Sequence, residues 1–381
     1  MIDAPLIRQE PPLASVLAWM RERTAICAWW LGGRVVVLVS AVIVHVAGPR
    51  RRLSAIEQKH VLGALQSWDG RWYRIVAADG YLLVPGHQSD PAFFPLFPAL
   101  LRVMHTLGVG YAVAGLVLAN GAFLVALLAF HELTATLFDG GFARRATAYL
   151  AIFPFGYVFS MTYPESIVLA AMTLSALAAM RGRWLPAGAL AAAAALARPE
   201  GVFVALPLVA LAWQTRRTLP PIRRGCALGA ALAPFAAAAA YPLYLDHVLH
   251  NPLAWNRAEQ AWGRRFSLLG PVHAIERVGQ AFAGNAWVVR DIAATILYVV
   301  LLYAAARAGA PRAWIAAGTA IVVLPVFSGA FTSIGRFGLL AVPVYWGLAA
   351  IGRRPRIDMT IRALSVALLA AATITIPLVF P

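Results

Sequence analysis

The sequence predicts an all-α polytopic membrane protein with ten or more hydrophobic helices. Hydrophobic residues make up 61% of the 381 residues, the mean hydropathy is +0.72, and charged residues reach only 13%, against roughly 25% in soluble domains. Little polar sequence separates the apolar runs, so one bundle of packed helices accounts for the chain better than several domains. We therefore expect a single transmembrane domain over residues 1–381.

The apolar stretches vary in length, and several are shorter than the ~20 residues that cross about 30 Å of hydrocarbon. Some must therefore be broken, tilted or re-entrant, and we place breaks at Pro154, Pro164 and Pro199. The first stretch has no small-residue cleavage site behind it, which indicates a retained helix. We expect about 10–12 transmembrane helices in total. The stretches lie near residues 26–48, 92–108, 111–133, 146–162, 164–180, 184–197, 201–214, 226–245, 287–309, 312–334, 337–351 and 362–379.

Two polar segments, residues 49–91 and 246–286, are long enough to form structure of their own. Both mix aromatic with charged side chains at intervals typical of short amphipathic helices lying at the membrane interface. We expect the first segment to form one large loop and the second to form another.

Arginine pairs follow alternate expected crossings, which the positive-inside rule places in the cytoplasm. That rule puts the loop 246–286, Arg198 and Arg336 on the outer side. The triplet Arg50–Arg52 argues instead for a cytoplasmic first loop, and a complete crossing by residues 92–108 would agree with it. The pairs are Arg144/Arg145, Arg181/Arg183, Arg216/Arg217, Arg223/Arg224, Arg307/Arg312 and Arg353/Arg354.

The net charge of +16 comes almost wholly from arginine, because Lys59 is the only lysine. One interpretation is a GC-rich genome with basic loops that face anionic lipid. The other is that some arginines bind phosphate, since a guanidinium offers a planar fork of donors. Nucleic acid is not an expected partner, because the arginines are scattered among hydrophobic runs.

Asp69 is the carboxylate best placed for catalysis. It stands in the run WDGRWY just beyond the first helix, where aromatic residues anchor a loop at headgroup level and a carboxylate can take a proton from an attacking hydroxyl. The competing interpretation is an aspartate that caps a helix beginning at Gly70 or Arg71. We assign Trp68, Arg71 and Tyr73 to substrate binding.

Glu165 lies among apolar residues after Tyr163 and Pro164, where an ionised side chain is expensive and indicates a functional site. Its alternative role is a favourable charge in the first turn of a helix. Tyr163 would neighbour the same substrate. The sequence therefore adds Glu165 and Tyr163 to the candidate binding residues.

Arg198 and Glu200 stand in ARPEG at a break between two short apolar segments, and Arg336 is isolated in SIGRF. Arg198 would bind a phosphate or form an internal ion pair with Glu165 or Glu200, and both interpretations stay open. Arg336 either extends to the interface or contacts an anionic headgroup. All three residues are candidates for donor binding.

Metal ligation is not expected, because the histidines lack HxxxH or HExxH spacing and Cys27 and Cys226 lack a metal-binding context. We therefore expect no cofactor. A divalent cation between Asp69 and Glu165 is the alternative.

Four segments in order, SWDGRWYRIVAADGY, AFFPLFPALLR, FPFGYVFSMTYPES and ARPEG, resemble the PIG-V type of GPI mannosyltransferase and its bacterial homologues. These enzymes belong to the GT-C superfamily of polytopic glycosyltransferases. The first two segments together are fairly specific. The resemblance covers the chain to residue 201, and beyond it only the topology and the late GRFGLL agree.

The resemblance implies a GT-C-like bundle and an inverting transfer from polyprenyl-phosphate mannose to a hydroxyl on the outer face. It implies that Asp69 is the base and that the loop 49–91 lies outside, so residues 92–108 would not cross completely. Arg198 and Arg336 would then hold the donor phosphate. Implied partners are a polyprenyl-phosphate sugar donor, a glycolipid, glycan or protein acceptor, and membrane lipids. The implied location is a bacterial plasma membrane, crossed several times.

The sequence departs from the family at two places. Leu82-Leu83-Val84-Pro85 follows Tyr81 where a glutamate is common, and Glu200 stands where an asparagine is common. These departures bear on which substrate is used more than on the reaction class. A transporter or flippase for a lipid-linked substrate remains the alternative, because it too would have broken helices and buried charges.

Overall fold

The computed structural model describes residues 13–48, 52–281 and 286–378. These residues form helices and no strand. The expected all-α polytopic membrane fold is confirmed, because several of the helices are long and apolar enough to cross a bilayer.

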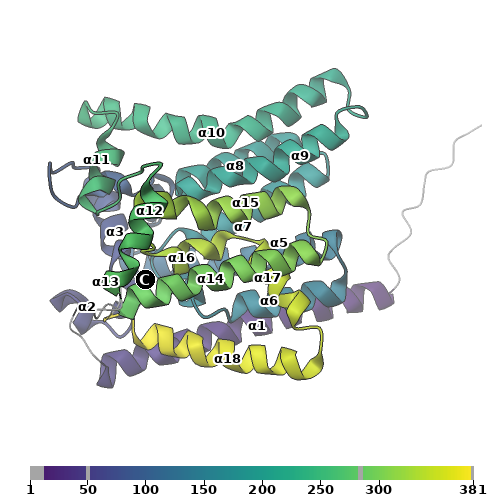
Figure 1. Cartoon of the computed structure of the whole chain (residues 1–381), viewed down its shortest axis with the longest axis horizontal. Coiled ribbons are helices and arrows are strands. Elements are labelled where there is room, and N and C mark those ends of the chain that lie inside the picture. The colour runs from purple at the N-terminus through teal and green to yellow at the C-terminus, as the bar shows by residue number, and fades with distance from the viewer. Residues whose placement is uncertain (1–12, 49–51, 282–285, 379–381) are drawn as a thin grey trace, which may run out of the picture.

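Within the described residues, five helices meet the length and composition of a membrane span. At a rise of about 1.5 Å per residue, even the shorter ones reach about 30 Å. Figure 1 shows them running along the long axis of the molecule. They are α1 (Leu13–Ala47), α5 (Tyr111–Leu137), α10 (Pro221–Leu249), α14 (Ala286–Arg307) and α18 (Pro355–Ile374).

The remaining apolar stretches form shorter or broken helices, as expected from their lengths. The described residues hold five full spans, or six when the last broken pair, bent by 90°, counts as one. In the predicted stretch 146–162 the helix ends at Ala151 and one 3₁₀ turn follows Pro154, so the break expected at this proline is present. The shorter elements are α6 (Gly140–Ala151), η3 (Gly156–Ser160), α7 (Glu165–Met180), α8 (Trp184–Ala197), η4 (Pro199–Val204), α9 (Ala205–Thr215), α15 (Arg312–Val323), η5 (Leu324–Ser328), α16 (Ile334–Phe337), η6 (Gly338–Leu340) and α17 (Pro343–Ile351).

The core lies around α7, most of whose residues are buried, and around the inner face of α8, whose buried residues are mainly alanine. The alanine-rich α8 packs against α10 at very short range: a Cβ built on Gly188 would lie 3.0 Å from the Cα of Ala230. Small residues at such contacts let two membrane helices approach closely. This packing fixes where α8 ends, and therefore where Arg198 begins the next turn.

The two predicted polar loops both contain short helices, and these gather at one end of the bundle, at the left in Figure 1. We call this the α3 end. The amphipathic helices expected in the first loop are therefore present. The elements at this end are α2 (Ala55–Lys59), η1 (Gly63–Gln66), α3 (Asp69–Asp79), η2 (Asp90–Ala92), α4 (Leu96–Thr106), α11 (Ala254–Ala261), α12 (Gly270–Glu276) and α13 (Val278–Ala281).

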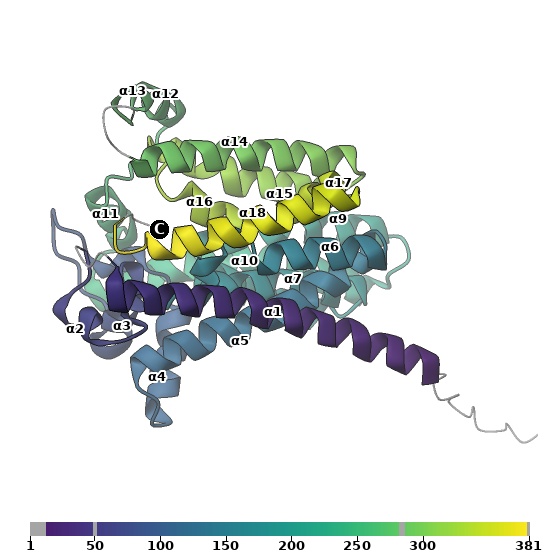
Figure 2. The ribbon, with the colours of Figure 1, turned by 90° about the horizontal axis from the view of Figure 1, so that it is seen from below.

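The helix α4 does not cross the bundle. It has 11 residues, which span about 16 Å, and Figure 2 shows it at the α3 end beside the start of α5. The first loop and the start of α5 therefore share one end. Arg52 lies at that end too, because its carbonyl accepts from Arg71 Nη2 at 3.0 Å; Arg50 and Arg51 lie outside the described residues.

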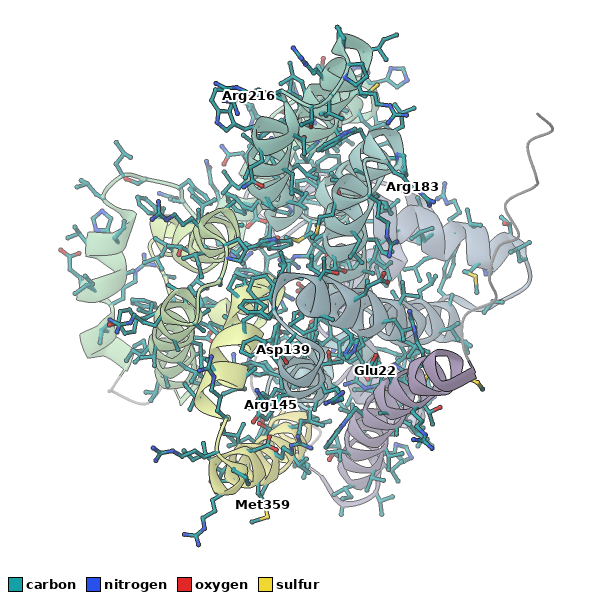
Figure 3. The ribbon with its side chains drawn as sticks, turned by 90° about the vertical axis from the view of Figure 1, so that its right-hand side faces the viewer. Glu22, Asp139, Arg145, Arg183, Arg216 and Met359 are labelled. Carbon is teal, nitrogen blue, oxygen red and sulfur yellow. The ribbon has the colours of Figure 1, made fainter. Side chains whose placement is uncertain are left out.

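The opposite end carries basic residues from the predicted arginine pairs. Figure 3 looks onto this end and shows Arg145, Arg183 and Arg216 around it, with Glu22 and Asp139 among them. Members of three of the predicted arginine pairs thus lie together at the end of the bundle opposite the α3 end.

Candidate functional site

Asp69 is the first residue of α3, and the backbone of the residue before it is strained. Trp68 before it has φ +57°, an uncommon conformation for a residue with a bulky side chain. The Trp68 indole donates to the carbonyl of Ile376 at 2.8 Å, and a Cβ on Gly70 would lie 3.3 Å from Thr162. Contacts with two distant segments therefore hold the start of α3 in place.

Arg336 lies on the four-residue helix α16, in the first arm of the bent helix pair. Ser333 before that helix has φ +66°, and its N–H donates to Asp291 Oδ2 at 2.8 Å. The Tyr298 hydroxyl donates to the carbonyl of Gly335 at 2.5 Å. These bonds fix an irregular turn inside the bundle, where such backbone lines a cavity or is buried in protein.

Five charged side chains from four breaks in the helices form one connected cluster. Arg336 Nη1 donates to Asp69 Oδ2 at 2.5 Å, and its Nε lies 3.4 Å from Glu165 Oε1. Arg198 Nη1 donates to the same Glu165 oxygen at 2.9 Å. Arg198 also forms a two-bond fork with Glu200, at 3.0 and 3.1 Å. We call Asp69, Glu165, Arg198, Glu200 and Arg336 the charge cluster.

Every member of the charge cluster is buried, with at most 8% of its surface exposed. Buried charges persist only when they are paired and hydrogen-bonded. Three carboxylates face two guanidinium groups, so the ionised cluster carries one net negative charge. A buried network of this kind at helix breaks indicates a functional site rather than a stabilising core.

Two tyrosines from the predicted set flank the cluster. The Tyr163 hydroxyl accepts from the backbone N–H of Asp69 at 3.2 Å, and the Arg336 guanidinium lies 5.1 Å from the Tyr163 ring centroid. Tyr73 packs edge-on against Phe93 and Phe97. Tyr163 thus supports the start of α3 and the arginine together.

A cavity of about 360 Å³ opens beside the charge cluster; we call it the first cavity. Asp69, Arg198, Glu200 and Arg336 face it from one side, and Tyr73 also lines it. Apolar side chains make up most of the rest of its wall. Among them are Phe93, Phe94, Phe203, Ile321, Leu324 and Phe337. A wall of this composition suits a ligand with one charged and one long apolar part.

A second cavity, of about 570 Å³, also has Asp69 in its wall. Trp68 and Arg71 line this second cavity, whereas the predicted binding residues Tyr73, Arg198, Glu200 and Arg336 line the first. Arg71 is also paired with Glu57, through Nε at 2.6 Å and Nη2 at 2.5 Å. Asp69, Trp262 and Arg264 line both cavities.

The structure decides between several interpretations that the sequence left open. Asp69 begins α3, yet its carboxylate bonds to Arg336 rather than to the helix N–H groups that a capping residue would satisfy. Glu165 occupies the first turn of α7 as the dipole interpretation predicts, but its side chain bonds to Arg198. Arg198 forms the internal ion pairs of its alternative interpretation. Glu165 and Tyr163 line neither cavity and lie behind the wall.

Sequence reasoning missed residues from the second polar loop. Glu259 and Arg264 line the first cavity together with Trp262. The mixture of aromatic and charged residues in 246–286 was visible in the sequence. It could not show that this loop meets the first one, as Trp262 does by packing edge-on against Trp72 at 5.5 Å.

Within the described residues, no group of three or more His, Cys, Asp or Glu side chains is arranged to hold a metal ion. Asp69 and Glu165 are instead joined through Arg336. A guanidinium at this position supplies the positive charge that holds the two carboxylates close together.

No protein-family model matches the chain, and no curated protein does. A similar solved structure is the apo form of the oligosaccharyltransferase of Archaeoglobus fulgidus, with a TM-score of 0.50 and 13% sequence identity over 91% of this chain and 56% of that chain. The shared feature is the fold.

Two further structures of the oligosaccharyltransferase resemble the chain less. The complex with Zn and sulfate has a TM-score of 0.46 and 15% identity, over 88% of this chain and 53% of that chain. The complex with an inhibitory peptide and a dolichol-phosphate has a TM-score of 0.41 and 13% identity, over 92% and 55%. The chain spans about half the length of the structures it matches.

Proposed function

We propose that this protein is a membrane glycosyltransferase that moves a mannosyl or related unit from a polyprenyl-phosphate sugar to an acceptor hydroxyl. The observation that carries the proposal is the position of Asp69, in the wall shared by the two cavities. A transfer between two substrates needs a base that both can reach. A carboxylate that lines two cavities meets that requirement.

The resemblance of four sequence segments to PIG-V type mannosyltransferases supports the same class of reaction, and the shared fold is compatible with it. The oligosaccharyltransferase structures include one in complex with a dolichol-phosphate, and a polyprenyl-phosphate donor is of the same chemical kind. In our proposal, the donor occupies the first cavity, with its isoprenoid chain against Phe203, Ile321 and Leu324. Apolar contact of this kind contributes binding in proportion to the area removed from water.

The acceptor enters through the second cavity and presents its hydroxyl to Asp69. The described hydrogen bonds of the Asp69 carboxylate go to Oδ2, from Arg336, so Oδ1 takes the proton of the acceptor hydroxyl. The acceptor oxygen forms a bond to the anomeric carbon, and the bond from that carbon to the phosphate oxygen breaks with its electron pair. Polyprenyl phosphate leaves, and attack from the opposite face inverts the anomeric configuration.

Orientation follows from the charge distribution. The arginine-rich end shown in Figure 3 lies in the cytoplasm of a bacterial cell, and the α3 end opens to the outer side of the plasma membrane. A glycolipid, a glycan or a protein presented on that side can serve as the acceptor.

A transfer assay tests the proposal. The purified protein in lipid vesicles is incubated with radiolabelled polyprenyl-phosphate mannose and membrane lipid extract as the acceptor source. We expect labelled product, release of polyprenyl phosphate, and a product whose anomeric configuration is opposite to that of the donor. Recovery of intact labelled donor in the other leaflet, with no product formed, would support a flippase and contradict the proposal.

A further inference from the structure

The two arginines expected to hold the donor phosphate are already occupied by carboxylates. Arg198 donates through Nε, Nη1 and Nη2 to Glu200 and Glu165, and Arg336 bonds to Asp69. The cluster that contains both arginines has a net negative charge when its three acids are ionised. A phosphate bound to either arginine would meet the net negative charge of this cluster, so a further cation is needed at this point.

Arg264 is placed to supply that cation. It lines both cavities, and its guanidinium carbon lies 5.1 Å from the centroid of the Phe337 ring. The guanidinium carbons of Arg198 and Arg336 lie 5.0 and 5.2 Å from the same centroid. Three guanidinium groups therefore surround one ring, and no two of their central carbons are more than about 10 Å apart.

The local backbone explains how Arg264 reaches this position. The helix α11 ends in a Schellman motif, with Gly263 at φ +81°. The N–H of Gly263 bonds to the carbonyl of Gln260 at 3.0 Å, and the N–H of Arg264 bonds to the carbonyl of Glu259 at 3.0 Å. This motif brings the side chains at positions 259 and 264 together.

The pair that the motif brings together is unusual in its chemistry. An apolar contact commonly accompanies a Schellman motif, but here Arg264 Nη1 lies 3.4 Å from Glu259 Oε2. The two side chains are 23% and 26% exposed, so this ion pair is far more open than those of the charge cluster, whose side chains are at most 10% exposed. A pair with these properties is the easiest of the arginine–carboxylate pairs at the first cavity to exchange.

The backbone that follows Arg264 is fixed to the opposite wall. The N–H of Arg265 bonds to the carbonyl of Ser328 at 3.3 Å, and the N–H of Ser267 bonds to the carbonyl of Phe327 at 3.0 Å. These two bonds tie the segment after α11 to η5, at the edge of the first cavity. Arg264 therefore has a fixed backbone and an exchangeable side-chain partner.

We propose that Arg264 is the residue that binds the phosphate of the lipid-linked donor, and that Glu259 is its counter-ion in the empty site. When the donor enters the first cavity, a phosphate oxygen takes the place of the Glu259 carboxylate on the Arg264 guanidinium. Arg198 and Arg336 keep their carboxylate partners and hold Asp69 and Glu165 in position. The inference rests on the proposed function, since it assigns one subsite of the same donor.

Equilibrium binding of polyprenyl monophosphate tests the assignment directly. The protein is placed in nanodiscs of phosphatidylcholine, and the dissociation constants of polyprenyl monophosphate and of the uncharged polyprenol are measured. We expect Arg264→Gln to weaken binding of the monophosphate by about 10- to 100-fold and to leave polyprenol binding unchanged. Arg264→Lys keeps the charge without the fork of donors, and its affinity for the monophosphate should lie between those of the wild type and Arg264→Gln.

Two further variants make the test specific. Arg265→Gln is the matched control, because Arg265 is exposed and lines neither cavity, and it should bind the monophosphate as the wild type does. Glu259→Gln removes the competing carboxylate and should bind the monophosphate as tightly as the wild type or up to about tenfold more tightly.

Equal monophosphate binding by Arg264→Gln and the wild type would overturn the assignment, and so would a loss in Glu259→Gln as large as that in Arg264→Gln. Sugar transfer separates this failure from that of the proposed function. If the wild type binds the monophosphate and transfers sugar, but Arg264→Gln does both equally well, only the Arg264 assignment is wrong. If the wild type neither binds the monophosphate nor transfers sugar, the proposed function is wrong.

Discussion

Three carboxylates share two guanidinium groups at the α3 end, and the surrounding protein excludes most water from them. Such an arrangement depends on every member, because removal of one partner leaves the other charges buried without compensation. Arg198 has two carboxylate partners, Glu165 on α7 and Glu200 on η4. Stability and geometry of the site are therefore coupled through Arg198.

We predict that Arg198→Met lowers the free energy of unfolding by about 3–5 kcal/mol, because it leaves the Glu165 and Glu200 carboxylates buried without their partner. Arg181→Met is the matched control. Arg181 pairs with Glu132 while the two side chains are 51% and 38% exposed, and loss of such a pair costs at most about 1 kcal/mol. Thermal unfolding in detergent measures both, and equal effects of the two substitutions would contradict the prediction.

A second residue-level prediction concerns Asp90, which lies in η2 outside the membrane spans. Burial raises the pKa of its carboxyl to about 6, while the unfolded value is about 3.9. The folded state therefore holds the proton more tightly, and the contribution of Asp90 to stability is largest below about pH 4 and is lost as the pH rises through about 6.

Unfolding of the wild type and of Asp90→Asn should be compared from pH 4 to pH 7. Asparagine keeps a carbonyl oxygen for the N–H of Leu82, which donates to Asp90 Oδ1 at 2.7 Å. We expect the difference in unfolding free energy between variant and wild type to grow in favour of the variant over this interval. A difference that is independent of pH would show that Asp90 does not titrate there.

At the scale of the elements, long helices could be predicted from the sequence and the breaks between them only in part. The apolar runs near residues 111–133 and 164–180 correspond to α5 and α7. An uninterrupted apolar run forms a helix whose side chains are buried in protein or face lipid along its whole length. Residues 152–163 are equally apolar, yet they form irregular backbone because Pro154 interrupts the helix and nearby side chains fill the space. Hydropathy does not distinguish these outcomes.

The pairing within the site was beyond what the sequence could show. Asp69 and Arg336 are separated by 267 positions, and only the arrangement of α3 against α16 brings them together. The motifs contained all three carboxylates of the charge cluster, and these stood out because charges among apolar residues are rare. Arg264 escaped notice because its significance depends on the fold of α11 against η5.

Helix packing gives a prediction at this scale. Gly188→Ala on α8 should destabilise the protein by about 1–3 kcal/mol, because the added Cβ would lie 3.0 Å from the Cα of Ala230 on α10. Gly229→Ala on α10 makes the same substitution where no atom lies within 4 Å of the added Cβ, and it should be neutral or stabilise by up to about 1 kcal/mol. Thermal unfolding of both variants checks the difference, and equal stability of the two would contradict it.

At the scale of the whole molecule, the bundle has one end with the cavities and another with clustered arginines. We predict that the α3 end faces the outside of the cell. In a variant without Cys27 and Cys226, cysteine at the exposed position Asp79 should react with an impermeant thiol reagent in intact cells. Cysteine at Arg217, at the opposite end, should react only after lysis. The reverse pattern would place the first loop in the cytoplasm.

The enzyme hypothesis depends on the carboxylate between the two cavities, and one comparison of variants examines it. Asp69→Asn keeps the shape of the side chain and removes the base, whereas Asp79→Asn makes the same change at the exposed end of the same helix. Transfer from radiolabelled polyprenyl-phosphate mannose should fall by about 10²–10⁴-fold in Asp69→Asn and stay at the wild-type rate in Asp79→Asn. Wild-type transfer by well-folded Asp69→Asn would show that Asp69 is not the base.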